Sequence, residues 1–279
     1  MDIHTTKKLN NGVKIPYLGL GVFQCNDGVE TVNAVRWAIE SGYRHIDTAA
    51  AYHNEQSVGQ AIRESGIDRK ELFVTTKLWK ENMLQGTQMQ AFEKSLKLLQ
   101  LDYIDLYLIH WPVPGKNVES WKILEEINKS GRARAIGVSN FVERHLDLLL
   151  QEAKIVPAVN QIQCHPQFSQ HPLATYCDKH GITVEAWSPL GGTGGNLLDD
   201  AVLKKIAAKH ARSAAQIVLR WDLQRGLITI PKSTHKERII ANTDIYGFKL
   251  SKDDMKAINE LNQNVRPFPK EWDPNFIDF

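Results

Sequence analysis

An acid, a phenol, an amine and an imidazole each lie at or just beyond the end of an apolar run that is typical of a β-strand. The four side chains belong to Asp47, Tyr52, Lys77 and His110. In a barrel of alternating strands and helices, the carboxyl ends of the strands meet at one rim, where chemistry is built. Any one of these residues could serve in packing or in capping a helix. Together, after neighbouring strands, they predict an active site.

These four side chains suit the reduction of a carbonyl group, which adds a hydride to carbon and a proton to oxygen. Tyr52 is the expected proton donor, because a cation beside a phenol stabilises the phenolate that remains. Lys77 would supply this cation, and we expect burial to lower the pKa of its ammonium group. Asp47 would hold the ammonium group in place. His110 would donate a hydrogen bond to the carbonyl oxygen and orient the substrate.

Short apolar runs of strand character alternate with longer amphipathic runs along the chain. Strands are expected at 18–22, 43–47, 72–76, 104–110, 134–139, 158–163, 183–188 and 227–231. Helices are expected at 30–41, 87–99, 119–130, 143–153, 170–180 and 213–225, with further helices at 199–210 and 252–262. The strands are apolar on both faces, as parallel strands covered by helices should be.

This alternation predicts an α/β fold, a (β/α)8 TIM barrel that occupies residues 1–279 as a single domain. Asn11-Gly12, between two short extended segments, predicts an N-terminal β-hairpin. After the last helix, residues 264–279 carry prolines and aromatic residues without a helical period. They form a C-terminal tail beyond the barrel.

Composition excludes several classes of protein. The chain has 42% hydrophobic and 24% charged residues and a net charge of +2, without a basic run that would suit nucleic acid. No apolar stretch approaches the length of a membrane span or a signal peptide core. Cys25, Cys164 and Cys177 are widely spaced and odd in number, which favours a reducing compartment. We therefore expect a cytoplasmic protein without nucleic-acid, membrane or metal partners, and we expect a monomer.

Several long motifs resemble those of the aldo-keto reductases. They are GYRHIDTAAAYHNE, TTKLW, DLYLIHWP, IGVSNF and IPKS, in this order and spacing. The resemblance covers essentially the whole chain and is strongest to the bacterial 2,5-diketogluconate reductase-like and methylglyoxal-reducing members. It implies that Asp47, Tyr52, Lys77 and His110 are a catalytic tetrad. It also implies NADPH-dependent reduction of small aldehydes, ketones and dicarbonyls, such as methylglyoxal or keto-sugars, to alcohols.

A nucleotide site is expected although the chain lacks the GxGxxG motif of a Rossmann fold. Barrels commonly bind phosphate between the loops that follow strands seven and eight. The residues of these two loops that could do so are Ser188, Leu190, Lys232, Ser233, Thr234 and Arg238.

The resemblance implies NADPH as the cofactor and assigns further contacts to it. Lys232 and Arg238 correspond to residues that bind the 2′-phosphate, and a basic pair suits that group. Trp187 takes the place where the nicotinamide ring is stacked, which is more often a tyrosine. Asn242 matches the asparagine that contacts adenine, whereas Ala241 replaces a glutamate of many members. The residues expected to bind the nicotinamide carboxamide are Ser139, Asn140 and Gln161.

The substrate pocket is expected to be aromatic. Phe23, Trp79 and Trp111 flank the tetrad in sequence. His110 is also expected to contact the substrate. The resemblance adds Trp272 and Phe276 from the C-terminal tail, the expected substrate loop. Segment 113–118 is short, which favours an open cleft for small aldehydes.

Two other functions remain open from the residues alone. Lys77 could form a Schiff base, as in a class I aldolase on the same barrel. Alternatively, the chain could be a nucleotide-binding regulatory subunit without turnover. The tyrosine and aspartate beside the lysine favour hydride transfer over both.

Overall fold

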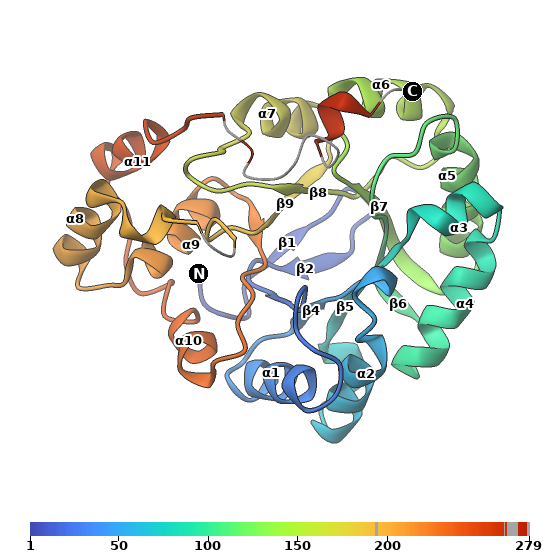
Figure 1. Cartoon of the computed structure of the whole chain (residues 1–279), viewed down its shortest axis with the longest axis horizontal. Helices are drawn as coiled ribbons and strands as arrows, with labels where there is room; N and C mark the ends of the chain where they lie inside the picture. The colour runs from blue at the N-terminus through green and yellow to red at the C-terminus, as the bar shows by residue number, and fades with distance from the viewer. Residues whose placement is uncertain (193–194, 265, 267–272, 278–279) are drawn as a thin grey trace.

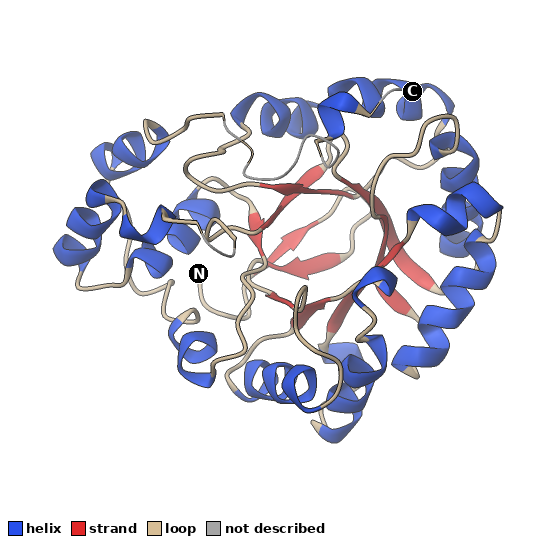
Figure 2. Cartoon of the chain, viewed as in Figure 1, coloured by secondary structure: helices blue, strands red, loops and turns tan. Residues whose placement is uncertain are grey.

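Eight parallel strands form the centre of the computed structural model, which describes residues 1–192, 195–264, 266 and 273–277. Helices surround the strands (Figure 1, Figure 2). Neighbours in the sheet are always neighbours in the chain, and the strands are β3 (Leu20–Gly21), β4 (His45–Asp47), β5 (Phe73–Leu78), β6 (Ile104–Ile109), β7 (Ala133–Ser139), β8 (Val159–Gln163), β9 (Thr183–Trp187) and β10 (Ile228–Thr229). The eight strands expected from the sequence are thereby confirmed.

Hydrogen bonds between the first and last strands close the sheet. The backbone N–H of Gly19 donates to the carbonyl of Thr229 (3.0 Å), and the N–H of Thr229 donates to the carbonyl of Tyr17 (2.9 Å). Leu18 and Thr229 form a parallel bridge at the same place. The prediction of a TIM barrel is confirmed, and closure leaves no unpaired edge.

Most helices on the outside agree with the amphipathic pattern. Those expected from the sequence are α1 (Val29–Glu40), α4 (Gln88–Leu99), α5 (Asn117–Lys129), α6 (Glu143–Glu152), α7 (His171–Lys179), α8 (Ala201–His210), α9 (Ala214–Gln224) and α11 (Lys252–Asn259). The sequence pattern misses α2 (Glu55–Glu64), α3 (Lys80–Gln85) and α10 (Lys236–Ala241).

Helix α2 is the longest of the helices that the pattern misses. Its buried apolar residues are only Val58, Ala61 and Ile62, so its apolar stripe is narrow. Gly59 also faces inward, and a Cβ there would lie 2.2 Å from the carbonyl oxygen of Leu99. Only a glycine allows α2 to pack this closely against the end of α4.

The strands bury both of their faces, as parallel strands between helices must. On β6, Leu106 and Leu108 pack in the inner cluster with Ile15 of the hairpin. Tyr107 and Ile109 pack in the larger cluster that includes the helices. This alternation, with a period of two, gives the barrel an inner and an outer apolar layer.

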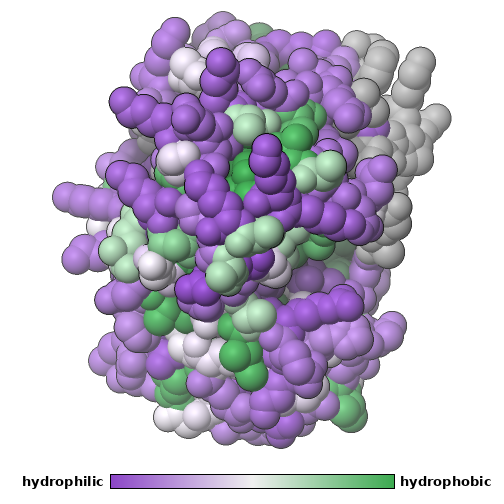
Figure 3. Space-filling view, turned by 90° about the vertical axis from the view of Figure 1, so that its left-hand side faces the viewer, coloured by the Kyte–Doolittle hydropathy of each residue, from purple (hydrophilic) through white to green (hydrophobic). Residues whose placement is uncertain are grey.

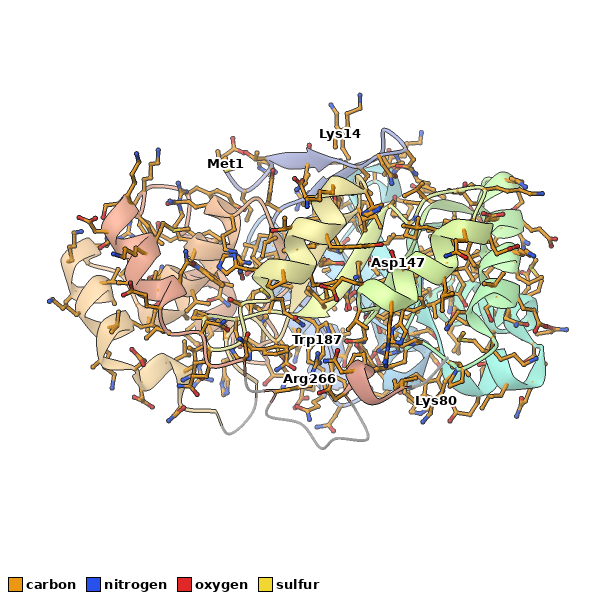
Figure 4. The ribbon with its side chains drawn as sticks, turned by 90° about the horizontal axis from the view of Figure 1, so that it is seen from above. Met1, Lys14, Lys80, Asp147, Trp187 and Arg266 are labelled. Atoms are coloured by element: carbon orange, nitrogen blue, oxygen red, sulfur yellow. The ribbon has the colours of Figure 1, made fainter. Side chains whose placement is uncertain are left out.

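The predicted hairpin is present and lies at the amino ends of the strands. Strands β1 (Thr6–Lys8) and β2 (Lys14–Pro16) pair antiparallel. The side-chain amide of Asn11 donates to the carbonyl of Arg134 near the start of β7 (3.0 Å). In Figure 4, Lys14 of the hairpin projects on one side of the barrel, whereas Trp187 lies toward the opposite side. The carboxyl ends of the strands are therefore left open for a site.

The described end of the tail docks on α6. One guanidinium nitrogen of Arg144, Nη2, lies within hydrogen-bond distance of three carbonyl oxygens, those of Pro274 (3.1 Å), Asn275 (2.8 Å) and Ile277 (2.7 Å). This part of the tail includes a short 3₁₀ helix, Pro274–Phe276. Trp272 and the side chain of Phe276 lie outside the described residues, so their role as substrate contacts stays a prediction.

The surface is mixed in character. The face in Figure 3 is largely hydrophilic, with apolar residues in scattered patches, as on most water-soluble domains. Among the described residues, none of the helices combines the length and the apolar character that crossing a membrane requires.

Candidate active site

The strand ends bring the four predicted catalytic side chains together. Asp47 ends β4, Lys77 is the last residue but one of β5, and His110 directly follows β6. Tyr52 lies in the 3₁₀ turn Ala50–Tyr52 that follows β4. The ammonium nitrogen of Lys77 lies 2.6 Å from Asp47 Oδ1 and 3.4 Å from the Tyr52 hydroxyl oxygen. Phenol, amine and carboxylate thus form one hydrogen-bonded line at the barrel mouth.

The charge state of Lys77 differs from the expectation. Burial by itself lowers the pKa of Lys77, but its ion pair and hydrogen bond with Asp47, together with the acidic groups of Tyr52 and Glu185, outweigh it, and the net pKa is raised. The sequence-based expectation of a lowered pKa is therefore wrong. The ammonium group also donates to the carbonyl of Thr48 (2.8 Å), so it is held in its charged form at neutral pH.

Tyr52 keeps its proton in this environment. Burial raises the pKa of its phenol, and the nearby charge of Lys77 offsets this only in part. A phenol that is protonated at neutral pH, with a cation 3.4 Å away to stabilise its anion, is suited to donate a proton.

The imidazole of His110 packs against two aromatic rings and makes no hydrogen bond with the described residues. Its ring centre lies 5.0 Å from that of Trp79 and 5.5 Å from that of Tyr52. Burial and the charge of Lys77 keep the pKa of His110 well below its ordinary value, so the imidazole is neutral. Its buried Nδ1 has no hydrogen-bond partner within the described chain. The imidazole can therefore orient a substrate oxygen without competing for the proton of Tyr52.

The residues expected to bind the nicotinamide lie in or at the ends of the next three strands, β7, β8 and β9. Ser139 ends β7, Gln161 lies in β8, and Trp187 ends β9. Asn140 connects this group to the tetrad, because its amide nitrogen donates to the carbonyl of His110 and its oxygen accepts from the Trp187 indole, each at 3.0 Å.

Two of these strand ends carry backbone strain. Asn140 and Ser188 directly follow β7 and β9 and have φ angles of 63° and 48°. This left-handed region is unfavourable for residues other than glycine, and such strain gathers at functional sites. The strain turns the chain sharply at the rim where the cofactor is expected.

The predicted phosphate-binding residues emerge at the same rim. The loop after β10 runs beside β3, since the N–H of Gly21 donates to the carbonyl of Pro231 (3.2 Å). The side chains of Lys232 and Arg238 are exposed and make no hydrogen bond or ion pair with the described residues. Two cationic side chains without an ion-pair partner among the described residues can form charge-assisted hydrogen bonds to phosphate groups.

The remaining predicted cofactor residues lie around this loop and the one after β9. The Ser233 hydroxyl accepts from the N–H of His235 (3.1 Å). Thr234 and Leu190 are half-buried, and Asn242 is buried at the end of α10. The donors and cations on this side of the rim fit a phosphorylated dinucleotide.

Aromatic side chains frame the tetrad. The Phe23 ring lies 5.0 Å from that of Tyr52 and is 43% exposed, so it borders the open side. Trp79 packs against His110, and Trp111 next to it is half-buried. The predicted pocket residues Phe23 and Trp79 are thus brought to the reaction centre.

Sequence reasoning missed one polar group directly beneath the tetrad. Glu185, in the middle of β9, is fully buried and accepts a hydrogen bond from the Gln161 amide (3.0 Å). A charged residue flanked by Val184 and Ala186 in a buried strand is a signal that could have identified it, because a lone buried carboxyl needs a partner.

A closed α/β barrel with this tyrosine, lysine, aspartate and histidine at its carboxyl rim defines an oxidoreductase that acts on carbonyl groups. The model of the aldo/keto reductase family matches residues 17–263. The chain belongs to this family.

Individual relatives agree with this assignment. The chain is 53% identical to the glyoxal reductase of Bacillus subtilis over 268 residues, which are 96% of each protein. It is 45% identical over 267 residues to methylglyoxal reductase DkgA of Escherichia coli K12, covering 95% of this chain and 96% of the relative. An aldo-keto reductase of Bombyx mori, solved in complex with NADP, superposes with a TM-score of 0.89 at 41% identity, covering 96% and 95% of the two chains. These relatives support carbonyl reduction and not an aldolase or a regulatory subunit.

Proposed function

We propose that this enzyme reduces small aldehydes and α-dicarbonyls, of the glyoxal and methylglyoxal class, with NADPH. The observation that carries the proposal is the protonated Tyr52 phenol 3.4 Å from the Lys77 ammonium group, which Asp47 in turn holds at 2.6 Å. This line of groups can donate one proton and stabilise the anion that remains.

Each residue of the tetrad then has one task. Tyr52 donates its proton to the carbonyl oxygen as the carbon is reduced. Lys77 stabilises the phenolate, and Asp47 keeps the ammonium group in position. The neutral imidazole of His110 orients the substrate oxygen beside the phenol. NADPH, when bound, supplies the hydride.

The proposed cofactor is supported by the chemistry of the groups at the rim. Trp187 offers an indole face, and the Gln161 amide oxygen accepts no hydrogen bond from the described residues. Lys232 and Arg238 offer two uncommitted cations for phosphate, which favours NADPH over NADH. The NADP complex of the Bombyx mori relative supports the same cofactor.

The proposed substrate class is supported by the exposed aromatic residue beside the tetrad and by the names of two relatives. Phe23 is 43% exposed and packs against Tyr52, so an accessible apolar side chain lies next to the proposed proton donor. The relatives named glyoxal reductase and methylglyoxal reductase act on compact dicarbonyls. A monomeric, cytoplasmic enzyme remains our expectation.

A coupled assay tests this function directly. Purified protein should oxidise NADPH when methylglyoxal, glyoxal or a small aldehyde is added, and NADH should serve much less well. Product analysis should show the corresponding alcohol. Borohydride trapping of substrate on Lys77, without NADPH oxidation, would instead support a Schiff-base mechanism and contradict the proposal.

A further inference from the structure

A buried polar chain continues from the tetrad into the barrel. The amide nitrogen of Gln161 donates to Asp47 Oδ2 (2.7 Å) and to Glu185 Oε2 (3.0 Å). The other oxygen of Glu185 lies 3.5 Å from Nε2 of His45. These side chains come from β4, β8 and β9, and all of them are buried. Glu185 is therefore one amide away from the carboxylate that holds Lys77.

The two carboxyl groups decide which way the Gln161 amide faces. An amide group has two N–H hydrogens at one end and only an acceptor oxygen at the other. The end between Asp47 and Glu185 faces two acceptors, so the nitrogen must lie there. Its two hydrogens are then both used. The amide oxygen, Oε1, is left as an acceptor that no described residue fills.

We propose that Glu185 is a positioning residue that holds the second amide hydrogen of Gln161 and so keeps Gln161 Oε1 ready to accept from the nicotinamide carboxamide. The inference rests on the proposed function, since it requires NADPH at this rim. The carboxamide carries the N–H donor that Oε1 lacks. Without Glu185, Asp47 alone would hold one hydrogen of the amide, and the amide could turn.

The protonation of Glu185 is consistent with this task. Burial, helped by the charge of Asp47, raises the pKa of Glu185 to about 8. The carboxyl is then largely neutral at neutral pH, and a neutral carboxyl keeps the capacity to accept a hydrogen bond. Oε2 remains an acceptor for Gln161. A neutral group holds the amide without weakening the ion pair of Asp47 and Lys77.

The buried carboxyl brings little benefit to stability. A polar oxygen without a hydrogen-bond partner in the interior is unfavourable. Glu185→Leu removes this oxygen, but it also leaves the second amide hydrogen of Gln161 without an acceptor, which is unfavourable in the interior. Because the two effects oppose each other, we expect Glu185→Leu to change the melting temperature little, while cofactor recognition suffers.

Binding of three ligands separates positioning from folding. The ligands are NADP⁺, its 3-acetylpyridine analogue, whose methyl ketone cannot donate a hydrogen bond, and 2′,5′-ADP, which lacks nicotinamide. Calorimetric titration of Glu185→Leu should show NADP⁺ bound roughly 5- to 10-fold more weakly, the effect of losing one oriented hydrogen bond. The affinities for the analogue and for 2′,5′-ADP should equal those of the parent enzyme.

Two further variants serve as controls. Glu185→Gln keeps an acceptor beside Gln161 and should retain most of the preference for NADP⁺ over the analogue. Asp222→Asn changes another fully buried carboxyl with an unpartnered oxygen, in α9, and should leave all three affinities unchanged. If Glu185→Leu does not fold, Glu185→Thr gives the same comparison.

The outcomes distinguish this inference from the proposed function. An unchanged ratio of NADP⁺ to analogue affinity in the Glu185 variants would overturn the inference alone, as would an equal loss for all three ligands. A parent enzyme that binds neither NADP⁺ nor 2′,5′-ADP would overturn the proposed function, and the inference with it.

Discussion

Tyr52 meets two opposing influences at the barrel mouth. Burial favours its neutral phenol, and the Lys77 ammonium group favours its phenolate. Since the neutral form prevails, the proton is present at neutral pH and can be given to a substrate. In the proposed reaction, the Lys77 charge acts mainly on the phenolate that forms, and stabilising this anion lowers the barrier.

Replacing Tyr52 with phenylalanine tests this role. The variant keeps the ring and its contact with Phe23 but loses the proton. We expect kcat to fall about 10²- to 10⁴-fold, as the loss of a general acid does, while NADPH affinity changes little. Steady-state kinetics and fluorescence titration measure the two quantities. Tyr103→Phe removes a hydroxyl near Arg69, away from the tetrad, and should leave both unchanged. Turnover close to the parent rate in Tyr52→Phe would show that another group donates the proton.

Lys232 and Arg238 are the residues whose roles depend most on the identity of the coenzyme. Each is exposed and unpaired with described residues, so alanine should cost no internal contact. We expect either substitution to weaken NADPH binding by on the order of 1.5–3 kcal/mol, because a charge-assisted hydrogen bond to the 2′-phosphate is lost. NADH binding should hardly change. Lys97→Ala, an exposed lysine on α4, is the control. Equal losses for both coenzymes would place these side chains on the shared pyrophosphate.

Among the secondary-structure elements, helices α8 and α11 are joined by hydrogen bonds to one carboxylate, that of Asp254. Asp254 lies in the first turn of α11 and accepts from the backbone N–H of Ser251, which caps the helix. It also accepts from Lys209 (2.9 Å) and from His210 (3.0 Å) of α8. Burial alone would raise the pKa of Asp254, but these bonds outweigh it and hold the pKa well below its ordinary value.

This lowered pKa predicts a pH-dependent contribution to stability. An aspartate whose folded pKa lies below its unfolded value of about 3.9 stabilises the fold above that pH, and its contribution is lost as the pH falls toward the folded pKa. We expect Asp254→Asn to lower the free energy of unfolding by roughly 1–3 kcal/mol at neutral pH. Urea unfolding should show the difference from the parent shrinking below about pH 4.

Asp253 offers a matched control for this element. It lies beside Asp254 in the same first turn but is exposed. Asp253→Asn removes the same charge from the same helix end without breaking a bond to α8, so its effect should be much smaller. Equal effects of the two substitutions would mean that helix electrostatics, and not the junction with α8, gives Asp254 its contribution.

In the whole molecule, the last described residues of the chain, 273–277, contact helix α6. The carbonyls of Pro274, Asn275 and Ile277 converge on the Arg144 guanidinium group of α6. The tail was expected from the sequence to act as a substrate loop. If it does, its position depends on this contact with α6.

Arg144→Ala tests this anchor. We expect the variant to show a changed KM for bulky aldehydes and faster proteolysis of the C-terminus, because three hydrogen bonds to the tail are lost. NADPH affinity and the melting temperature should stay close to those of the parent. Arg63→Ala, an exposed arginine of α2, is the control. An identical substrate profile in Arg144→Ala would mean that the tail plays no part in selecting substrates.

Features that depend on a local pattern of residues could be predicted from the sequence. Apolar runs and turn residues marked all eight strands, and the polar residues that end them marked the tetrad. Strand β6 could be predicted because both of its faces are buried, so it appears in the sequence as a continuous apolar run. Helix α2 was not predicted from the sequence, because its apolar stripe is narrow and includes Gly59. The reason for this glycine, close packing against α4, is visible only in the folded structure.

How these groups act on one another depends on contacts that form only in the folded chain. The expectation for Lys77 failed because Asp47, the carboxylate that does most to raise its pKa, comes from β4, 30 positions away in the sequence. The contact of Gln161 with Asp47 joins residues separated by 114 positions. Electrostatic and hydrogen-bond energies depend on distances of a few ångströms and on burial, and no pattern of neighbouring residues contains those distances.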